Sequence, residues 1–165
     1  MCYSSNENKY EIIAKIGEGG YGMIYKAREI NTSNIVTIKQ IKRQYPETNE
    51  GIPQSVLCEI NILNELKNET NIINIKDVQY CKRRKYIYII YDYYEFDLHH
   101  IIYQKQQITI QQMKSYMIQM IKSLQTVHSK GYIHCDIKPS NFLISPKNEI
   151  KLIDFGVSIK VDKEN

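Results

Sequence analysis

Hydrophobic and polar positions alternate with a short period in the first half of the chain. Brief apolar segments are separated by Gly and polar turns over residues 10–41, a pattern typical of an antiparallel sheet. Strands are predicted at 12–16, 23–25 and 35–38, and further β-rich runs lie at 72–73 and 86–90. This part of the chain therefore predicts a sheet built largely from neighbouring strands.

Two helices are predicted where apolar residues recur every three to four positions. Pro53 opens the first, which places Val56 or Leu57, Ile60, Leu63 and Leu66 on one face. The second begins at a capping box of Thr109 and Gln112 and ends near Gly131. Its apolar stripe is predicted to face the core and consists of Ile110, Met113, Met117, Met120, Ile121, Leu124 and Val127.

Two short strands are predicted after this helix, at 142–144 and 150–153. The whole pattern predicts an α+β fold in which a β-rich half with one helix precedes a more helical half. The two halves join near 92–97.

Composition excludes several classes of protein. The chain has 165 residues, 42% of them hydrophobic and 24% charged, which excludes a disordered or fibrous chain. Its four Cys lack metal-ligand spacing, and the polar N-terminus and the absence of a long apolar run predict an intracellular protein without a membrane span. A net charge of +4 is too small to indicate nucleic-acid binding, and the basic run 82–85 fits a solvated turn better.

Glycines cluster at Gly17, Gly19 and Gly22, between two predicted strands. Glycine allows a backbone to approach a phosphate closely, but it also suits an ordinary hairpin. A dinucleotide-binding unit would place these glycines between a strand and a helix. The pattern therefore favours a glycine-rich hairpin over phosphate groups.

Together with three further motifs, this hairpin makes the sequence resemble a eukaryotic protein kinase. The four motifs, in chain order, are Gly17–Ile24, Val36–Lys39, His134–Asn141 and Asp154–Gly156. The resemblance implies a kinase-like α+β fold with an antiparallel N-lobe sheet, one helix and the start of a mainly helical C-lobe. It implies an N-terminal tail at 1–9, an N-lobe at 10–91, a hinge at 92–97 and a partial C-lobe at 98–165.

The resemblance assigns roles in phosphoryl transfer, which depends on charge neutralisation and alignment. Lys39 would hold the α- and β-phosphates of ATP and form an ion pair with Glu59. Asp136 would accept the proton of the substrate hydroxyl, Lys138 would contact the transferred phosphate, and Asn141 with Asp154 would bind Mg²⁺. His134 is expected to be a core residue stacked with Phe155 and Leu63. Lys138 followed by Pro resembles Ser/Thr kinases, so the expected substrate is a Ser or Thr of a protein.

The same resemblance implies a set of ATP-binding positions, with Thr37 standing where the family usually has Ala. Tyr91 would take the gatekeeper position behind adenine. The implied set is Ile16, Gly17, Glu18, Gly19, Gly20, Tyr21, Gly22, Ile24, Thr37, Lys39, Asp92, Tyr94, Asp97, Leu143 and Asp154.

Residues 50–60 are similar to the cyclin-recognition helix of cyclin-dependent kinases, which implies a cyclin-type subunit bound through 50–66. Tyr21 matches the Tyr that those kinases use for inhibitory phosphorylation, and 92–102 is more similar to the Mediator-associated subgroup. The resemblance implies a nuclear or cytoplasmic location. The alternative is a non-catalytic kinase-like module that binds a cyclin-type partner.

The sequence departs from the family in two respects. Cys58, Cys135 and Ile159 replace Arg residues that bind an activation-loop phosphate in many cyclin-dependent kinases, so we expect no such phosphate to be read here. Only nine residues follow Gly156, whereas kinase domains are about twice as long as this chain. The long helix at 110–130 would then expose an apolar face that should pack on the missing helices. We therefore expect a C-terminally incomplete gene model, with an expressed fragment and a truncated product as alternatives.

Overall fold

The computed structural model describes residues 9–19, 22–42, 52–81, 86–104 and 107–161, and the chain divides into two compact units. The first unit comprises 1–53 and 75–93, and the second comprises 54–74 and 94–165. The predicted lobe bounds follow sequence motifs and stay predictions.

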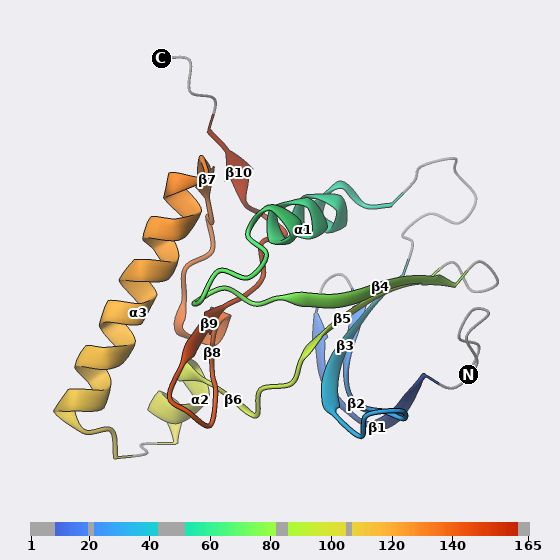
Figure 1. Cartoon of the computed structure of the whole chain (residues 1–165), viewed down its shortest axis with the longest axis horizontal. Coiled ribbons are helices and arrows are strands. Elements are labelled where there is room, and N and C mark those ends of the chain that lie inside the picture. The colour runs from blue at the N-terminus through green and yellow to red at the C-terminus, as the bar shows by residue number, and fades with distance from the viewer. Residues whose placement is uncertain (1–8, 20–21, 43–51, 82–85, 105–106, 162–165) are drawn as a thin grey trace. The chain divides into compact units, whose positions relative to one another are not determined.

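The first unit contains a five-stranded antiparallel sheet (Figure 1). Its spatial order is β1-β2-β3-β5-β4, so the first three strands form consecutive hairpins and β4 lies at an edge. The strands are β1 (Tyr10–Gly19), β2 (Gly22–Glu29), β3 (Ile35–Lys42), β4 (Ile75–Cys81) and β5 (Tyr86–Asp92). The strands predicted from alternation are thereby confirmed.

One hydrophobic cluster supports this sheet. Ala27 and Val36 have no exposed surface and are register partners on β2 and β3. Ile38 on β3 pairs with Ile90 on β5, and both are buried. Tyr10, Cys81 and Tyr88 complete the cluster. Burial of such side chains is the main favourable term in folding, so it holds the strands that carry the glycine motif.

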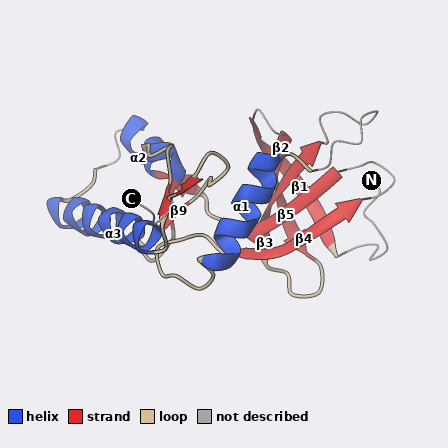
Figure 2. Cartoon of the chain, turned by 90° about the horizontal axis from the view of Figure 1, so that it is seen from above, coloured by secondary structure: helices blue, strands red, loops and turns tan. Residues whose placement is uncertain are grey.

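The second unit combines three helices with short strands (Figure 2). Its strands form a three-stranded sheet in the order β6-β8-β9 and a two-stranded sheet of β10 and β7. The elements are α1 (Gln54–Glu65), β6 (Phe96–Asp97), α2 (Leu98–Tyr103), α3 (Ile110–Ser129), β7 (Tyr132–Ile133), a 3₁₀ turn (Pro139–Asn141), β8 (Phe142–Ile144), β9 (Ile150–Leu152) and β10 (Ile159–Lys160). The predicted α+β class is confirmed.

The run at 72–73, predicted to be β-rich, forms a single bridge rather than a strand. Ile72 pairs in parallel with Leu152 of β9, and the N–H of Ile73 donates to the Leu152 carbonyl over 3.1 Å. The Leu152 N–H donates in turn to the Asn71 carbonyl over 2.9 Å. These bonds fasten the segment after α1 to β9.

Helix α3 begins at the predicted capping box, where the Gln112 N–H donates to Thr109 Oγ1 over 3.1 Å and the Thr109 N–H donates to Gln112 Oε1 over 3.0 Å. Gly131 follows the helix with a φ of +79°, a left-handed conformation that suits glycine. Both predicted ends of the helix are confirmed.

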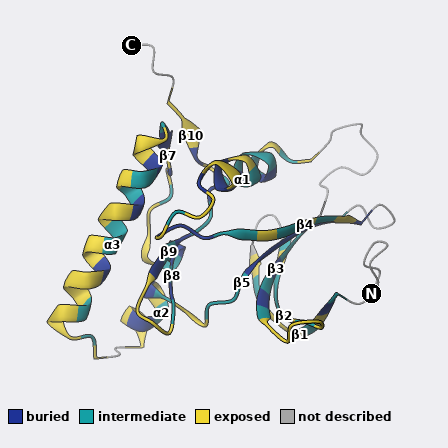
Figure 3. Cartoon of the chain, in the orientation of Figure 1, coloured by how far each residue is buried: buried dark blue, intermediate teal, exposed yellow. Residues whose placement is uncertain are grey.

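The apolar stripe of α3 does not form the core face that its periodicity predicts over most of the helix, and its exposure agrees with the exposed apolar face that the kinase resemblance implied. Ile110, Met113, Met117 and Ile121 are between 51% and 67% exposed (Figure 3). The buried side chains are instead Tyr116, Ser123 and Val127. Val127 belongs to the predicted stripe, so the prediction holds only near the C-terminal end.

Polar contacts explain which face of α3 packs against the rest of its unit. The Tyr116 hydroxyl donates to Asn148 Oδ1 over 2.8 Å. Gln119 accepts from the Ile150 N–H over 2.8 Å and donates to the Asn148 carbonyl over 3.0 Å. Because these groups satisfy the backbone of the β8–β9 turn, the polar side of α3 faces that turn. No helix in the described part of the chain is long and apolar enough to cross a membrane.

Candidate active site

The glycine motif lies on a hairpin, as the sequence predicts. Gly17 pairs with Ile24 and Gly19 with Gly22 across β1 and β2. Gly20 and Tyr21 lie outside the described residues. Gly22 has a φ of +153°, and a Cβ there would lie 1.9 Å from the Gln40 carbonyl oxygen on β3. The close packing of β2 on β3 therefore requires glycine at this position.

Strand register brings several predicted nucleotide-binding residues of the first unit side by side. Ile24 on β2 pairs with Gly17 on one side and with Lys39 on the other. Thr37 pairs with Tyr91, which is buried, whereas Ile16 is 47% exposed. Glu18, next to Gly17, forms an ion pair with Lys15. The Lys15 ammonium holds the pKa of the Glu18 carboxyl below its usual value.

Asp92 ends β5 and carries an ion pair. Lys76 Nζ lies 2.7 Å from Asp92 Oδ1. The resemblance assigns adenine contact to the backbone of Asp92 and Tyr94. The ion pair of the Asp92 side chain with Lys76 is therefore compatible with that role. Tyr94 belongs to the second unit and is half-buried. Contact of either residue with a nucleotide stays a prediction.

Asp136, Lys138 and Asn141 form a compact polar group in the second unit. Lys138 Nζ lies 2.6 Å from Asp136 Oδ2, and Asn141 Nδ2 donates to the same oxygen over 3.0 Å. Asn141 Nδ2 also donates to the Asp136 carbonyl over 2.8 Å. Asn141 is buried, while the Asp136 side chain is one-third exposed at 33%. A buried amide therefore orients a carboxylate that solvent can reach.

The electrostatics of this group keep the carboxylate ionised. The hydrogen bond from Lys138 is the main cause that lowers the pKa of Asp136; burial acts in the opposite direction, and the hydrogen bond from Asn141 lowers the pKa further. The same bond raises the pKa of Lys138. At neutral pH the pair is therefore a carboxylate that can accept hydrogen bonds beside a protonated amine.

His134 connects this loop to the segment that carries Asp154. The Asp136 N–H donates to His134 Nδ1 over 3.2 Å, so the neutral ring carries its proton on Nε2, which lies 2.9 Å from the Ile153 carbonyl. The ring is buried and meets Phe155 edge to face, with centroids 4.8 Å apart. The expected contact with Phe155 is thus present, but its geometry is T-shaped rather than stacked. Leu63 is buried as well.

The remaining predicted residues of the second unit have defined places in the fold. Glu59 lies on α1 and is buried. Asp97 caps α2, where its Oδ1 accepts the His100 N–H over 2.7 Å. Leu143 on β8 is the register partner of Asp97. These placements do not test binding of ATP, and the ion pair of Glu59 with Lys39 stays a prediction.

The donor set fits Mg²⁺, which prefers oxygen ligands. Asn141 uses Nδ2 for its two bonds to Asp136, so its amide oxygen is not involved in them. Asp154 contributes a carboxylate from a left-handed backbone with a φ of +64°. The described residues contain no group of three or more His, Cys, Asp or Glu able to hold a metal ion. Two protein ligands suit an ion that is shared with phosphates and water.

Sequence reasoning missed one polar residue of this region, Ser158. Its side chain is buried, with Oγ donating to the His134 carbonyl over 3.1 Å. Cys58 Sγ on α1 donates to the Ser158 carbonyl over 3.3 Å. The only signal in the sequence is a small polar residue between Val157 and Ile159, which alone indicates no role.

Comparison with known proteins agrees with this geometry. Residues 10–165 match the protein kinase domain, and the chain therefore belongs to the protein kinase family. It is similar to cyclin-dependent kinase-like 5 of Homo sapiens, with 35% identity over 159 residues that cover 96% of this chain and 16% of that protein.

Two further relatives carry related names. Cyclin-dependent kinase 1 of Encephalitozoon cuniculi (strain GB-M1) is 36% identical over 155 residues, which cover 90% of this chain and 50% of that protein. Cell division control protein 2 homolog 1 of Trypanosoma brucei brucei is 36% identical over 154 residues, covering 91% and 48%. The chain thus spans half or less of the length of these relatives. They confirm the resemblance to cyclin-dependent kinases, whereas the Mediator-associated subgroup stays a prediction.

Proposed function

We propose that the protein containing this chain transfers the γ-phosphate of ATP to a Ser or Thr of a protein substrate. The observation that carries this proposal is the group of Asp136, Lys138 and Asn141, in which a reachable carboxylate is paired with a cation and oriented by a buried amide. Membership of the kinase family supports the same reaction.

In this mechanism the substrate hydroxyl attacks the γ-phosphorus while the bond to the β-phosphate oxygen breaks and ADP leaves. Asp136 accepts the hydroxyl proton, for which its lowered pKa keeps the carboxylate available. The Lys138 ammonium offsets negative charge on the transferred group. Mg²⁺ held by Asn141 and Asp154 would neutralise the phosphates.

The nucleotide contacts of this proposal are those that the resemblance to kinases assigns. Lys39, Thr37 and the glycine hairpin belong to the first unit, and Leu143 and Asp154 belong to the second. The strand register of Gly17, Ile24 and Lys39 supports the first set. Asp97 and Tyr94 complete the proposed set from the second unit.

We further propose that residues 50–66 bind a cyclin-type subunit, and that the protein acts in the nucleus or the cytoplasm. The resemblance of 50–60 to a cyclin-recognition helix and the names of the relatives support this partner. A purely non-catalytic module is less well supported, because it would not need the polar group around Asp136.

The test is phosphate transfer from radiolabelled ATP to a Ser/Thr peptide by the full-length protein. Asp136→Asn should lower kcat by about 100-fold or more, because a general base contributes on that order. ATP-dependent thermal stabilisation should persist in this variant. Lys147→Gln is the matched control, because Lys147 is an exposed residue of the β8–β9 turn, and its kcat should equal that of the wild type.

Either of two results would contradict the proposal. One is full turnover in Asp136→Asn. The other is absence of both turnover and ATP-dependent stabilisation in the wild type, with retained binding of a cyclin-type protein, which would favour the non-catalytic module.

A further inference from the structure

Cys135, the residue before Asp136, has a left-handed backbone with a φ of +65°. Residues other than Gly, Asn and Asp adopt this conformation rarely, and it persists only where neighbouring groups hold it. The two peptide groups that flank Cys135 are both held. On one side the His134 carbonyl accepts from Ser158 Oγ, and on the other the Asp136 N–H donates to His134 Nδ1.

The Ser158 hydroxyl is well placed to hold the first of these groups. Its residue is 6% exposed, and its hydrogen bond to the His134 carbonyl is buried. The Ser158 N–H donates to the Phe155 carbonyl over 3.1 Å, which closes a turn directly after Asp154. Because Phe155 also contacts the His134 ring, the turn is attached to the catalytic loop at two points.

Helix α1 contacts the same turn through Cys58. Cys58 Sγ donates to the Ser158 carbonyl, and Ser55 lies near Gly156, where a Cβ would be 3.8 Å from the Ser55 carbonyl oxygen. Burial raises the pKa of the Cys58 thiol, so it stays protonated and remains a donor at neutral pH. Cys58, where the kinase resemblance would expect an Arg, thus makes a neutral contact between α1 and Ser158.

We propose that Ser158 is a positioning residue that holds Cys135 in its left-handed conformation, thereby fixing the Asp136 carboxylate for proton acceptance and linking it to α1. This inference rests on the proposed kinase function. Loss of the Ser158 hydroxyl leaves a buried carbonyl without this donor and frees the strained peptide to relax. A glycine at 135 would relieve the strain and make the hydroxyl less necessary.

A double-mutant cycle on the full-length protein tests this coupling. Ser158→Ala should lower kcat about tenfold, with KM for ATP unchanged within twofold, because the affected group acts on the substrate hydroxyl. The same substitution in a Cys135→Gly background should lower kcat less than threefold. Ser145→Ala is the matched control, because the Ser145 hydroxyl likewise bonds backbone groups. It accepts from the N–H groups of Lys147 and Glu149 in the β8–β9 turn. Its kcat should be unchanged.

Amide hydrogen exchange gives a second readout that does not require turnover. Ser158→Ala should accelerate exchange of the Asp136 amide about tenfold and leave the Ile144 amide unchanged, and Cys58→Ala should accelerate it to a smaller extent. Unchanged exchange at Asp136, or equal loss of kcat in the two backgrounds, would overturn the proposal. If the wild type showed no turnover, the proposed function would fail, and the exchange measurement alone would decide whether Ser158 holds this loop.

Discussion

At the scale of single residues, the catalytic loop depends on which protonation state His134 adopts. Nδ1 accepts the Asp136 N–H and Nε2 lies against the Ile153 carbonyl, so both nitrogens are used only in the neutral ring. Burial is the main cause that lowers the pKa of His134, and Lys138 lowers it further. The hydrogen bond to the Ile153 carbonyl and then the carboxylates of Asp154 and Asp136 act in the opposite direction but do not reverse the shift.

This lowered pKa predicts a dependence of stability on pH. The unfolded chain binds a proton at His134 near pH 6.5, whereas the folded chain binds it only at a lower pH. The free energy of unfolding should therefore be highest above pH 6.5 and fall as the pH decreases toward the folded pKa. Urea unfolding between pH 5 and 8, compared with His134→Gln, measures this. A wild-type slope equal to that of His134→Gln would contradict the expectation.

The sequence allowed us to predict the residues that belong to a motif, but not the residues whose role depends on packing. Asp136, Lys138 and Asn141 are recognisable because their chemistry requires fixed residue types at fixed spacing. Ser158 is not recognisable, because its role depends on a carbonyl group 24 residues away along the chain. Such a partner is known only once the fold is known.

At the scale of elements, the β1–β2 hairpin is restricted by its neighbour β3. The backbone of β2 at Gly22 approaches the Gln40 carbonyl so closely that no Cβ fits. Gly17 has no such restriction, because a Cβ there would lie 3.5 Å from the Ile24 side chain, an ordinary contact distance. Packing against β3 therefore requires glycine at Gly22, whereas packing does not require it at Gly17.

This difference predicts a large loss of stability for one glycine-to-alanine substitution and a small change for the other. Gly22→Ala should destabilise the chain by about 2 kcal/mol or more, because β2 must move away from β3. Gly17→Ala should change the free energy of unfolding by less than about 1 kcal/mol, because its strand conformation accepts a side chain. Thermal unfolding of the two variants measures the difference, and equal destabilisation would be inconsistent with the described register.

Strands and helices were predictable from the sequence because alternation and helical period are local properties. The buried face of α3 was not predictable from periodicity, because the apolar stripe suggested a core face; only the resemblance to kinases implied that this stripe is exposed. Gln119 instead bonds backbone groups of Asn148 and Ile150, and the Tyr116 hydroxyl bonds the Asn148 side chain. The hydrophobic pattern of a sequence does not indicate which polar groups will need hydrogen-bond partners in the fold.

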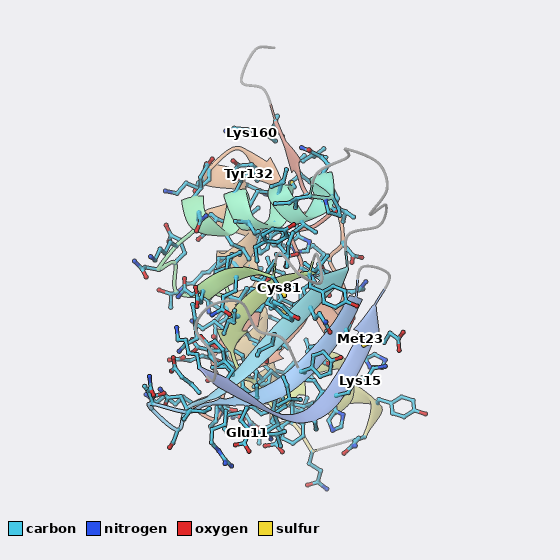
Figure 4. All side chains as sticks on the ribbon, turned by 90° about the vertical axis from the view of Figure 1, so that its right-hand side faces the viewer. Glu11, Lys15, Met23, Cys81, Tyr132 and Lys160 are labelled. Atoms are coloured by element: carbon cyan, nitrogen blue, oxygen red, sulfur yellow. The ribbon has the colours of Figure 1, made fainter. Side chains whose placement is uncertain are left out.

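At the scale of the whole molecule, α3 carries an exposed apolar stripe of Ile110, Met113, Met117 and Ile121 (Figure 3). A second group of exposed apolar side chains lies on the two-stranded sheet, where Ile133 pairs with Ile159. Beside it Lys160 lies over the Tyr132 ring, with Nζ 5.3 Å from the centroid (Figure 4). Exposed apolar patches of this kind promote association.

The stripe predicts that solubility and stability respond to different positions on one helix. In the 165-residue chain, Met117→Gln with Ile121→Gln should change stability by less than about 0.5 kcal/mol per site, as exposed substitutions usually do. The same variant should raise the concentration at which light scattering begins. Val127→Ala, at a fully buried position, should cost about 2 kcal/mol. A large loss of stability in the double variant would show that the stripe is buried.

The first unit is assembled from two separated stretches of chain, because 54–74 belongs to the second unit. During synthesis, β1, β2 and β3 can pair as soon as they emerge, since their connections are short. Strand β5 reaches its place beside β3 only after α1 and the following segment have left the ribosome. Closing a connection of this length costs entropy that grows slowly with its length. The β3–β5 pairing therefore forms only after residues 86–92 have been synthesised, and a nascent chain that ends before residue 86 exposes the unpaired edge of β3.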